Sequence, residues 1–247
     1  MSSPVRRVLI VLPAYNEEGS IAEVLNEIRS HHPSVECLVV DDGSADATAL
    51  VARRVGVPVA RLPFNLGVGG AMRLGFRYAL EEGFDAVVQV DADGQHDPAA
   101  VPALLKELGA ADIVVGARFA GVGTYEASGL RRVAMRVIAA VLSRTAKTKL
   151  TDATSGFKAC GPRAIALFAD HMPAEYLGDT VEALVIAARA GMRIVQVPVS
   201  MRARTAGRPS HNPIKSAVYL VRAFVALGFA FLRPAPHVRD AEGTVHP

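Results

Sequence analysis

Two carboxylates one residue apart, Asp91 and Asp93, form the strongest chemical signal in this sequence, because they follow the apolar run Ala86–Val90 and precede Gly94. Side chains at alternate positions of a strand point to the same side, and a turn at Gly94 lets both carboxylates reach one cation. Mg²⁺ and Mn²⁺ prefer oxygen ligands, and substrate phosphates usually complete their coordination. The triplet therefore predicts a divalent-cation site that binds a diphosphate, with an acidic turn that binds no ligand as the alternative.

Two further polar clusters follow apolar runs earlier in the chain. Residues Pro13–Glu18 come after the run Val8–Leu12, and residues Asp41–Ser44 come after the run Cys37–Val40. The carboxyl ends of parallel strands form one rim of a sheet, where ligands of open α/β folds bind. We therefore expect both clusters to lie on the same rim as the Asp91–Asp93 triplet.

A βα alternation supplies the elements that would position these clusters. Short apolar runs alternate with segments of helical length, a pattern that builds a mostly parallel, Rossmann-like sheet flanked by helices. Beyond about residue 125 the pattern becomes more helical. The predicted strands are Val8–Leu12, Cys37–Val40, Val57–Arg61, Ala86–Val90, Ile113–Val115 and Arg193–Val199, and the predicted helices are Ser20–Ser30, Ala45–Val55, Gly69–Glu82, Pro98–Leu108, Leu130–Leu142, Ala164–Asp170 and Thr180–Ala190.

The cluster after the second predicted strand has two interpretations. Asp41 or Asp42 can accept hydrogen bonds from a base or from ribose hydroxyls, while Ser44 can cap the next helix. A plain turn with a helix cap is the alternative. The glycine-rich segment Gly67–Gly70 likewise offers backbone N–H groups to a phosphate, or serves only close helix packing. It lacks the third glycine of a dinucleotide-binding fingerprint.

Composition limits the class of protein. With 247 residues, 51% hydrophobic and 21% charged, the chain suits one ordered α/β domain rather than a disordered protein. Cys37 and Cys160 stand singly among apolar or small residues, so we expect buried free thiols, which fits a reducing cytoplasm. The net charge of +3 is mild, and a basic patch for anionic substrates or lipid head groups explains it as well as nucleic acid does.

Taken together, four motifs resemble family 2 glycosyltransferases of the GT-A fold. They are Leu12–Glu17 (LPAYNE), Asp41–Thr48 (DDGSADAT), Asn65–Gly67 (NLG) and Asp91–His96 (DADGQH), and their order and spacing match that family. Within it, Asp152–Lys158 (DATSGFK), followed by Val197–Val199 and a basic loop, is similar to the dolichyl- or polyprenyl-phosphate mannosyl- and glucosyltransferases. The resemblance covers about residues 7–210.

The resemblance implies a role for each matching residue. It implies metal ligands at Asp91, Asp93 and Gln95, with Mg²⁺ or Mn²⁺ as cofactor. It implies a donor site made of Pro13, Tyr15, Glu17, Asp42, Gly67, Asp91, Ala92, Asp93, Arg202 and Arg208. It implies acceptor contacts from Arg118, Arg131, Ser155 and Arg204. The catalytic candidates are Asp179, Asp152 and Arg118, with Asp179 as the base and Asp152 as its alternative.

The resemblance further implies a metal-dependent inverting transfer of a hexose from GDP-mannose or UDP-glucose to a polyprenyl or dolichyl phosphate. A phosphate acceptor is already anionic at pH 7, so it needs no general base, whereas a hydroxyl acceptor needs one. Asp179 therefore discriminates the two acceptor classes. A family 2 transferase with a sugar or other hydroxyl acceptor, and a non-catalytic lipid- or nucleotide-binding module, are the alternatives. No nucleic-acid partner is expected.

The sequence predicts one GT-A domain over residues 1–233. About 7–125 form the nucleotide-sugar half, 126–212 the acceptor half and 213–233 a C-terminal amphipathic helix, with 234–247 a disordered tail. The chain departs from membrane-bound relatives because it has one ambiguous apolar helix where they carry transmembrane helices. That helix lies on an anionic membrane, docks on a small membrane partner or packs on the core. Without a signal peptide, a cytoplasmic location is expected, with peripheral membrane binding as an option.

Overall fold

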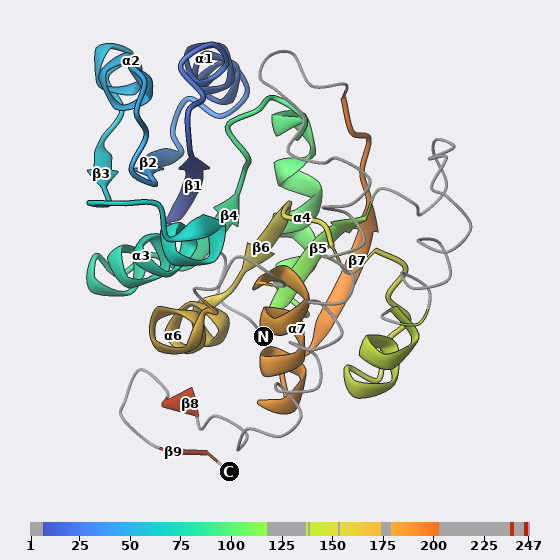
Figure 1. The fold of residues 1–247 in the computed structure, drawn as a ribbon. Helices are drawn as coiled ribbons and strands as arrows, with labels where there is room; N and C mark the ends of the chain where they lie inside the picture. Colours follow the sequence, from blue (N-terminus) through green and yellow to red (C-terminus); the bar gives the residue numbers. More distant parts are fainter. Residues whose placement is uncertain are drawn as a thin grey trace.

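A seven-stranded sheet with the strand order β3-β2-β1-β4-β6-β5-β7 forms the centre of the fold (Figure 1). The computed structural model describes residues 7–117, 137, 139–152, 154–173, 179–202, 238–239 and 245–246. Within the sheet every pairing is parallel except those of β6, which is antiparallel to both neighbours. The strands are β1 (Val8–Ala14), β2 (Glu36–Asp41), β3 (Val59–Arg61), β4 (Ala86–Gln89), β5 (Ile113–Ala117), β6 (Lys158–Cys160) and β7 (Ile194–Pro198).

Helices cover both faces of the sheet. Each helix presents an apolar stripe to the strands, as α1 does with Ile21, Val24, Leu25 and Ile28 at helical spacing. One core lies between the sheet and α1, α2 and α4, and the other between the sheet and α3, α6 and α7. The helices are α1 (Ile21–His31), α2 (Thr48–Arg54), α3 (Gly67–Glu81), the 3₁₀ turn η1 (Pro98–Ala100), α4 (Val101–Leu108), α6 (Pro162–His171) and α7 (Asp179–Arg189).

Close packing places α3 directly on β1. A Cβ atom added at Gly75 of α3 would lie 2.6 Å from Cγ1 of Val11, so only glycine allows this separation between helix and strand. The rings of Phe76 and Phe168 then join α3 to α6, with their centroids 5.2 Å apart. The N-terminus of α3 lies at the carboxyl end of β2, where the N–H of Gly67 donates to Asp42.

The α/β architecture predicted from the sequence is confirmed, but β6 was not predicted. This strand has only three residues, one of them Lys158, and its register places Lys158 opposite both Gln89 and Val115. A segment this short carries no alternation that could be recognised. Its insertion brings the DATSGFK motif beside the carboxyl end of β4.

Several boundaries also differ from the predictions. Helix α2 begins at Thr48 rather than Ala45, and the predicted helix Pro98–Leu108 starts as a 3₁₀ turn. Of the predicted helix Leu130–Leu142, the described residues 137 and 139–142 are helical, and the helix continues to residue 145. Two short strands, β8 (Val238–Arg239) and β9 (Val245–His246), pair antiparallel, where the sequence led us to expect no regular structure.

The predicted C-terminal helix 213–233 lies outside the described residues. In the part of the chain that the structure describes, no helix combines the length and apolar character needed to cross a bilayer.

Candidate active site

The loops after β1 and β2 are joined by reciprocal hydrogen bonds. Asn16, whose φ is 55°, anchors them: its N–H donates to Oγ of Ser44, and its Oδ1 accepts from the N–H of Ala45, both at 2.9 Å. Further bonds are Glu17 N–H to Thr48 Oγ1, Glu18 N–H to Asp46 Oδ2, and Ala47 N–H to Glu18 Oε2. Two motifs of the sequence therefore stabilise each other.

These hydrogen bonds show that the predicted capping role of Ser44 is wrong. Ser44 is not the cap of α2, since its hydroxyl accepts from Asn16 and the helix starts after Ala47 with no side-chain cap. Tyr15 stands at the rim with 48% of its surface exposed. The predicted donor residues Pro13 and Glu17 are half-buried beside it, and Oε2 of Glu17 accepts from the Ser20 hydroxyl.

Asp42 ties the end of β2 to the N-terminus of α3. Its carboxylate accepts from the backbone N–H groups of Leu66 at 2.7 Å and Gly67 at 2.8 Å. Burial raises the pKa of this carboxyl above its ordinary value, and the two hydrogen bonds oppose that shift without cancelling it. The structure thus brings the predicted donor residues Asp42 and Gly67 together, with the Gly67 N–H donating to a carboxylate of the protein itself.

The neighbouring carboxyl group has a different role. Asp41 is fully buried; its Oδ1 accepts from the Ser44 N–H at 3.0 Å, and its Oδ2 lies 3.1 Å from Nε of Arg61. Arg61 also donates to the Ser44 carbonyl at 2.8 Å. The sequence did not decide whether Asp41 or Asp42 would bind a ligand. In the structure Asp41 stabilises the turn, and Asp42 holds the N-terminus of α3.

Asp91 and Asp93 lie in a turn that follows β4. The strand ends at Gln89, two residues earlier than Asp91, and Gly94 has a φ of 77°. Oδ1 of Asp93 accepts from the Gln95 N–H at 3.0 Å, which closes the turn. Asp93 and Ala92 are buried, whereas Asp91 and Gln95 are half-buried at the rim. The orientation of the two carboxylates is therefore set by the turn rather than by strand alternation.

The donor atoms of this turn suit a hard divalent cation. Two carboxylates and one carboxamide, from Asp91, Asp93 and Gln95, are oxygen ligands, and Mg²⁺ or Mn²⁺ needs only one or two carboxylates when phosphates and water complete the shell. Among the described residues no group of three or more His, Cys, Asp or Glu side chains has a metal-binding arrangement. A resident cage is therefore not indicated there, and the donor set fits a cation shared with a phosphate ligand.

The DATSGFK segment forms a wall of this site. A Cβ atom added at Gly156 would lie 2.9 Å from Nε2 of Gln89 and 3.1 Å from Oδ2 of Asp91, so the glycine lets the segment reach the carboxylate. Ser155, the predicted acceptor residue, is buried, and its hydroxyl has no hydrogen-bond partner in the described structure. Such a buried hydroxyl is the kind of group that a ligand satisfies.

Asp152 contributes to the turn rather than facing outward. It is fully buried, and its Oδ1 accepts from the N–H and hydroxyl of Thr154 at 3.1 and 3.0 Å. Its carbonyl accepts from Nε2 of Gln196 on β7. These contacts shape the segment that carries Ser155.

Arg202, predicted to bind the donor, forms ion pairs with Glu27 of α1 and with Asp97, at 2.9 Å to the latter. Its hydrogen bond to Glu27 raises its pKa. A donor role for Arg202 would require it to exchange these partners for phosphate. Asp179 is the first residue of α7, and the remaining predicted residues, Arg118, Arg131, Arg204 and Arg208, lie outside the described residues.

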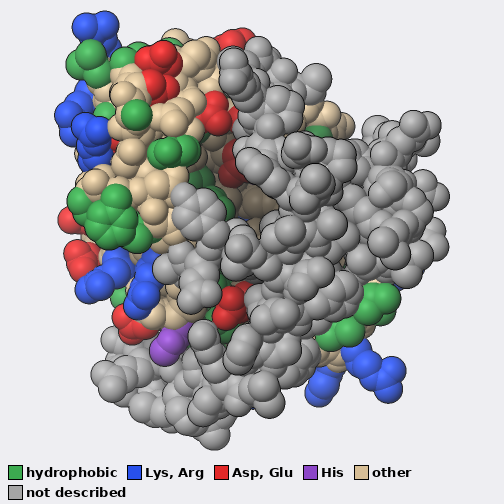
Figure 2. All heavy atoms as spheres, viewed as in Figure 1, with side chains coloured by type: hydrophobic (Ala, Val, Ile, Leu, Met, Phe, Trp, Pro, Cys, Tyr) green, Lys and Arg blue, Asp and Glu red, His purple; other side chains and the backbone are tan. Residues whose placement is uncertain are grey.

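On the surface, acidic side chains border a hollow near the middle of the face in Figure 2, and basic side chains occupy one margin of the same face. Comparison with known proteins identifies the family to which the chain belongs. The model of glycosyl transferase family 2 matches residues 9–166. The chain belongs to the family 2 glycosyltransferases. It is therefore a glycosyltransferase, as its motifs predicted.

Two relatives of this glycosyltransferase act on polyprenyl carriers, according to their names. The undecaprenyl-phosphate mannosyltransferase of Micrococcus luteus is 34% identical over 208 residues, which cover 81% of this chain and 86% of the relative. The polyprenol monophosphomannose synthase of Mycolicibacterium smegmatis is 33% identical over 171 residues, 63% of this chain and 62% of the relative.

A solved structure confirms the GT-A fold. Glucosyl-3-phosphoglycerate synthase from Mycobacterium tuberculosis, in complex with Mn²⁺, UDP-glucose and phosphoglyceric acid, superposes with a TM-score of 0.71 at 23% identity, covering 98% of this chain and 86% of that one. At this identity the likeness concerns the fold alone.

Two residues next to the Asp91–Gln95 turn were not singled out from the sequence. Gln89, on β4, donates to Oδ1 of Asp91, and His96 accepts from the Asp91 N–H. In the sequence, Gln89 lies within an apolar run and His96 at the end of the DADGQH motif. A polar residue inside an otherwise apolar strand, two positions before a carboxylate, is the signal that would have found Gln89.

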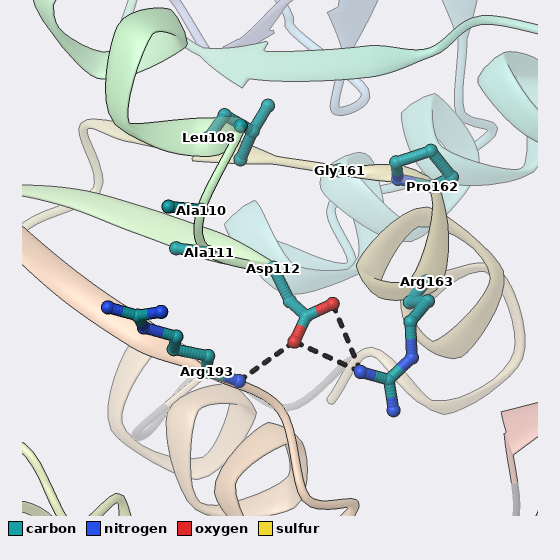
Figure 3. A pocket seen from close by; sticks show the side chains of 9 residues that line it. Leu108, Ala110, Ala111, Asp112, Gly161, Pro162, Arg163 and Arg193 are labelled. Atoms are coloured by element: carbon teal, nitrogen blue, oxygen red, sulfur yellow. Dashed lines mark hydrogen bonds and ion pairs between the residues drawn. The ribbon is translucent and has the colours of Figure 1, made fainter. Parts of the chain in front are cut away.

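A separate hollow lies at the amino ends of β5 and β7 (Figure 3). It has a volume of about 330 Å³ and is lined by Asp112 and the arginines 163 and 193, among others. Asp112 accepts from Nη1 of Arg163 at 3.1 Å and from the backbone N–H of Arg193 at 2.8 Å. This carboxylate joins α6 to the start of β7, so its hydrogen-bonding capacity is used to hold the fold together.

Proposed function

We propose that this glycosyltransferase transfers a hexose from a nucleotide sugar to a polyprenyl phosphate, with inversion at the anomeric carbon. The observation that carries the proposal is the pairing of an oxygen-donor turn, Asp91 to Gln95, with a buried Ser155 hydroxyl that lacks a partner. The first suits a cation on the donor diphosphate, and the second suits an acceptor phosphate. The names of two relatives support the same acceptor class.

We infer GDP-mannose as the first donor to test, because both relatives are named for mannose transfer. UDP-glucose is the second donor. Tyr15 and Asp42, at the ends of β1 and β2, are the residues we assign to the nucleotide, since they lie at the rim where α/β sheets bind such ligands.

In the proposed reaction the bound cation would neutralise charge that develops on the leaving diphosphate. Asp91, Asp93 and Gln95 would hold it. Ser155 would donate its hydroxyl hydrogen to an acceptor oxygen and so orient the phosphate in line with the anomeric carbon. That phosphate is already anionic near pH 7, so the attack needs no general base.

The test is a transfer assay with labelled GDP-mannose or UDP-glucose and undecaprenyl phosphate in detergent, with Mn²⁺, Mg²⁺ or EDTA. We expect a labelled lipid product with one donor only, abolished by EDTA. Asp179→Asn should lose less than about tenfold in kcat if the acceptor is a phosphate, and about 10²–10⁴-fold if it is a hydroxyl. No lipid product with either donor would refute the proposed acceptor.

We further propose that the protein acts at the cytoplasmic face of a membrane, with residues 213–233 as the contact. The sequence of this segment combines Lys215, Arg222 and Arg233 with apolar residues, as surface-bound helices do. Flotation of the full chain with vesicles tests this. Binding to phosphatidylglycerol vesicles but not to phosphatidylcholine vesicles is expected, and equal or absent binding would contradict it.

A further inference from the structure

Both oxygens of the Asp91 carboxylate face side chains on the protein side. Nε2 of Gln89 donates to Oδ1 at 3.1 Å, and Nε2 of His96 lies 3.5 Å from Oδ2. Gln89 is 3% exposed and His96 is 2% exposed. The carboxylate is thus approached from the interior by two buried polar groups, while its other side remains at the rim.

The hydrogen bonds of His96 fix which ring nitrogen carries the hydrogen. Nδ1 accepts from the Asp91 backbone N–H at 2.9 Å, so Nδ1 bears no hydrogen. A neutral imidazole then has its hydrogen on Nε2, the atom that faces Oδ2 of Asp91. The ring of His96 therefore contacts both the backbone N–H and the carboxylate of Asp91.

The imidazole ring is also held in place. It stacks on Phe157 with a centroid distance of 4.8 Å and an interplanar angle of 17°. The backbone of His96 forms a bridge with Met201, and the N–H of Arg202 donates to the Gln95 carbonyl at 3.0 Å. The orientation of the ring is consequently determined by the core and by the segment after β7.

The orientation of the Gln89 amide is determined in the same way. If its oxygen and nitrogen were exchanged, the oxygen would face Oδ1 of Asp91 and repel it, so the NH₂ group must lie toward the carboxylate. Oε1 of Gln89 has no hydrogen-bond partner in the described structure. A buried glutamine with one unsatisfied end costs stability, which is reasonable if its other end has a function.

We propose that His96 and Gln89 are positioning residues that hold the Asp91 carboxylate in the orientation that a divalent cation requires. Each oxygen uses one lone pair toward the protein and keeps another for the cation. Mutation of a side chain that hydrogen-bonds a metal ligand typically lowers metal affinity by about 10–100-fold. This inference rests on the proposed cation site, and its test separates the two.

The test compares His96→Asn with His96→Gln. The Asn amide occupies the position of Nδ1 and can accept from the Asp91 N–H, but it does not reach Oδ2. The Gln amide extends to the position of Nε2 and can donate to Oδ2. Binding of Mn²⁺ is measured by electron paramagnetic resonance of the free ion, with and without GDP. We expect His96→Asn to weaken Mn²⁺ binding by about 10–100-fold and His96→Gln to recover most of it.

Gln89→Leu is the second variant, because it removes the donor to Oδ1 without touching His96, and the same weakening is expected. His32→Asn is the matched control: His32 contacts the Pro98 carbonyl at 2.8 Å rather than a carboxylate, so Mn²⁺ binding should not change. Circular dichroism confirms that each variant is folded. If His96→Asn does not fold, Gln89→Leu carries the test.

Asp93→Ala separates the two ideas. If it abolishes Mn²⁺ binding while folded His96→Asn and Gln89→Leu bind as the wild type does, the positioning role is refuted and the cation site stands. If Asp93→Ala itself binds Mn²⁺ normally, the cation site is refuted and the positioning role with it. A purely structural role would lower thermal stability but leave the Mn²⁺ affinity of the folded protein unchanged, and that result also refutes the proposal.

Discussion

Gly156 is the position where one added methyl group should act directly on the proposed cation site. The backbone there lies outside the left-handed region, so alanine introduces no backbone strain. Its Cβ would lie 2.9 Å from Nε2 of Gln89 and 3.1 and 3.3 Å from the two oxygens of Asp91. Ordinary contacts begin at 3.4 Å, so in Gly156→Ala these groups must withdraw by up to about 0.5 Å.

Two free-energy effects follow from this displacement. Overpacking against the buried Gln89 side chain costs about 1–3 kcal/mol, and the lower entropy of the unfolded alanine chain returns about 0.4–1 kcal/mol. We expect a net loss of about 0.5–2 kcal/mol in the free energy of unfolding. Because the Asp91 carboxylate moves with its hydrogen-bond partner, Mn²⁺ affinity should fall by about 10–100-fold, comparable to the loss of an outer-shell partner.

Urea unfolding measures the first effect, and calorimetric titration with Mn²⁺ in the presence of GDP measures the second. Gly161→Ala is the control, since its nearest atoms would be 3.6–3.8 Å from the new Cβ, an ordinary contact distance. That variant should retain wild-type Mn²⁺ affinity. If Gly156→Ala retains wild-type Mn²⁺ affinity, the close approach of the DATSGFK segment to the Asp91 carboxylate does not affect cation binding, and the prediction is refuted.

Three further predictions concern titratable groups. Burial raises the pKa of Asp42 in the folded protein. The free energy of unfolding of the wild type should therefore rise relative to that of Asp42→Asn as pH falls from 7 through the folded pKa, and level off below the unfolded pKa of 3.8. Urea unfolding across this pH range measures the difference between the two proteins, and a difference that stays constant contradicts the prediction. Burial alone would raise the pKa of Asp46, but hydrogen bonds from Thr48 and Glu18 lower it. The stability advantage of the wild type over Asp46→Asn should therefore be complete above pH 3.8 and shrink below it. An advantage that grows toward acid pH would refute this prediction. Burial raises the pKa of Cys37 to about 11 and of Cys160 to about 12, so neither thiol should react with iodoacetamide at pH 8 until the protein is unfolded in urea, and rapid native labelling would contradict it.

Local patterns were enough to predict most of the sheet and the rim on which its polar motifs lie. The apolar runs that became β1, β2, β4, β5 and β7 are nearly continuous, as buried parallel strands are, and the polar motifs fall at the carboxyl ends of β1, β2 and β4. The family motifs then supplied roles for individual residues. Neither step requires knowledge of which distant segments meet.

Contacts between distant segments could not be predicted. β6 is too short to show a pattern, yet its register alone places Gly156 against Asp91. The partners of Arg202, Glu27 and Asp97, lie 175 and 105 positions away in the chain, and only the folded topology brings them together. Ser44 could serve as a cap or as a partner for the preceding loop, and the loop conformation of Asn16 decided between them.

The most direct test of the central claim is calorimetric titration with GDP-mannose, UDP-glucose, GDP and UDP, in Mn²⁺ and then in EDTA, on wild type and Asp93→Ala. We predict that one nucleotide sugar binds only with Mn²⁺ and that Asp93→Ala loses this binding while remaining folded. Equal binding in EDTA, or in Asp93→Ala, would contradict a cation held by Asp91, Asp93 and Gln95 on the donor diphosphate.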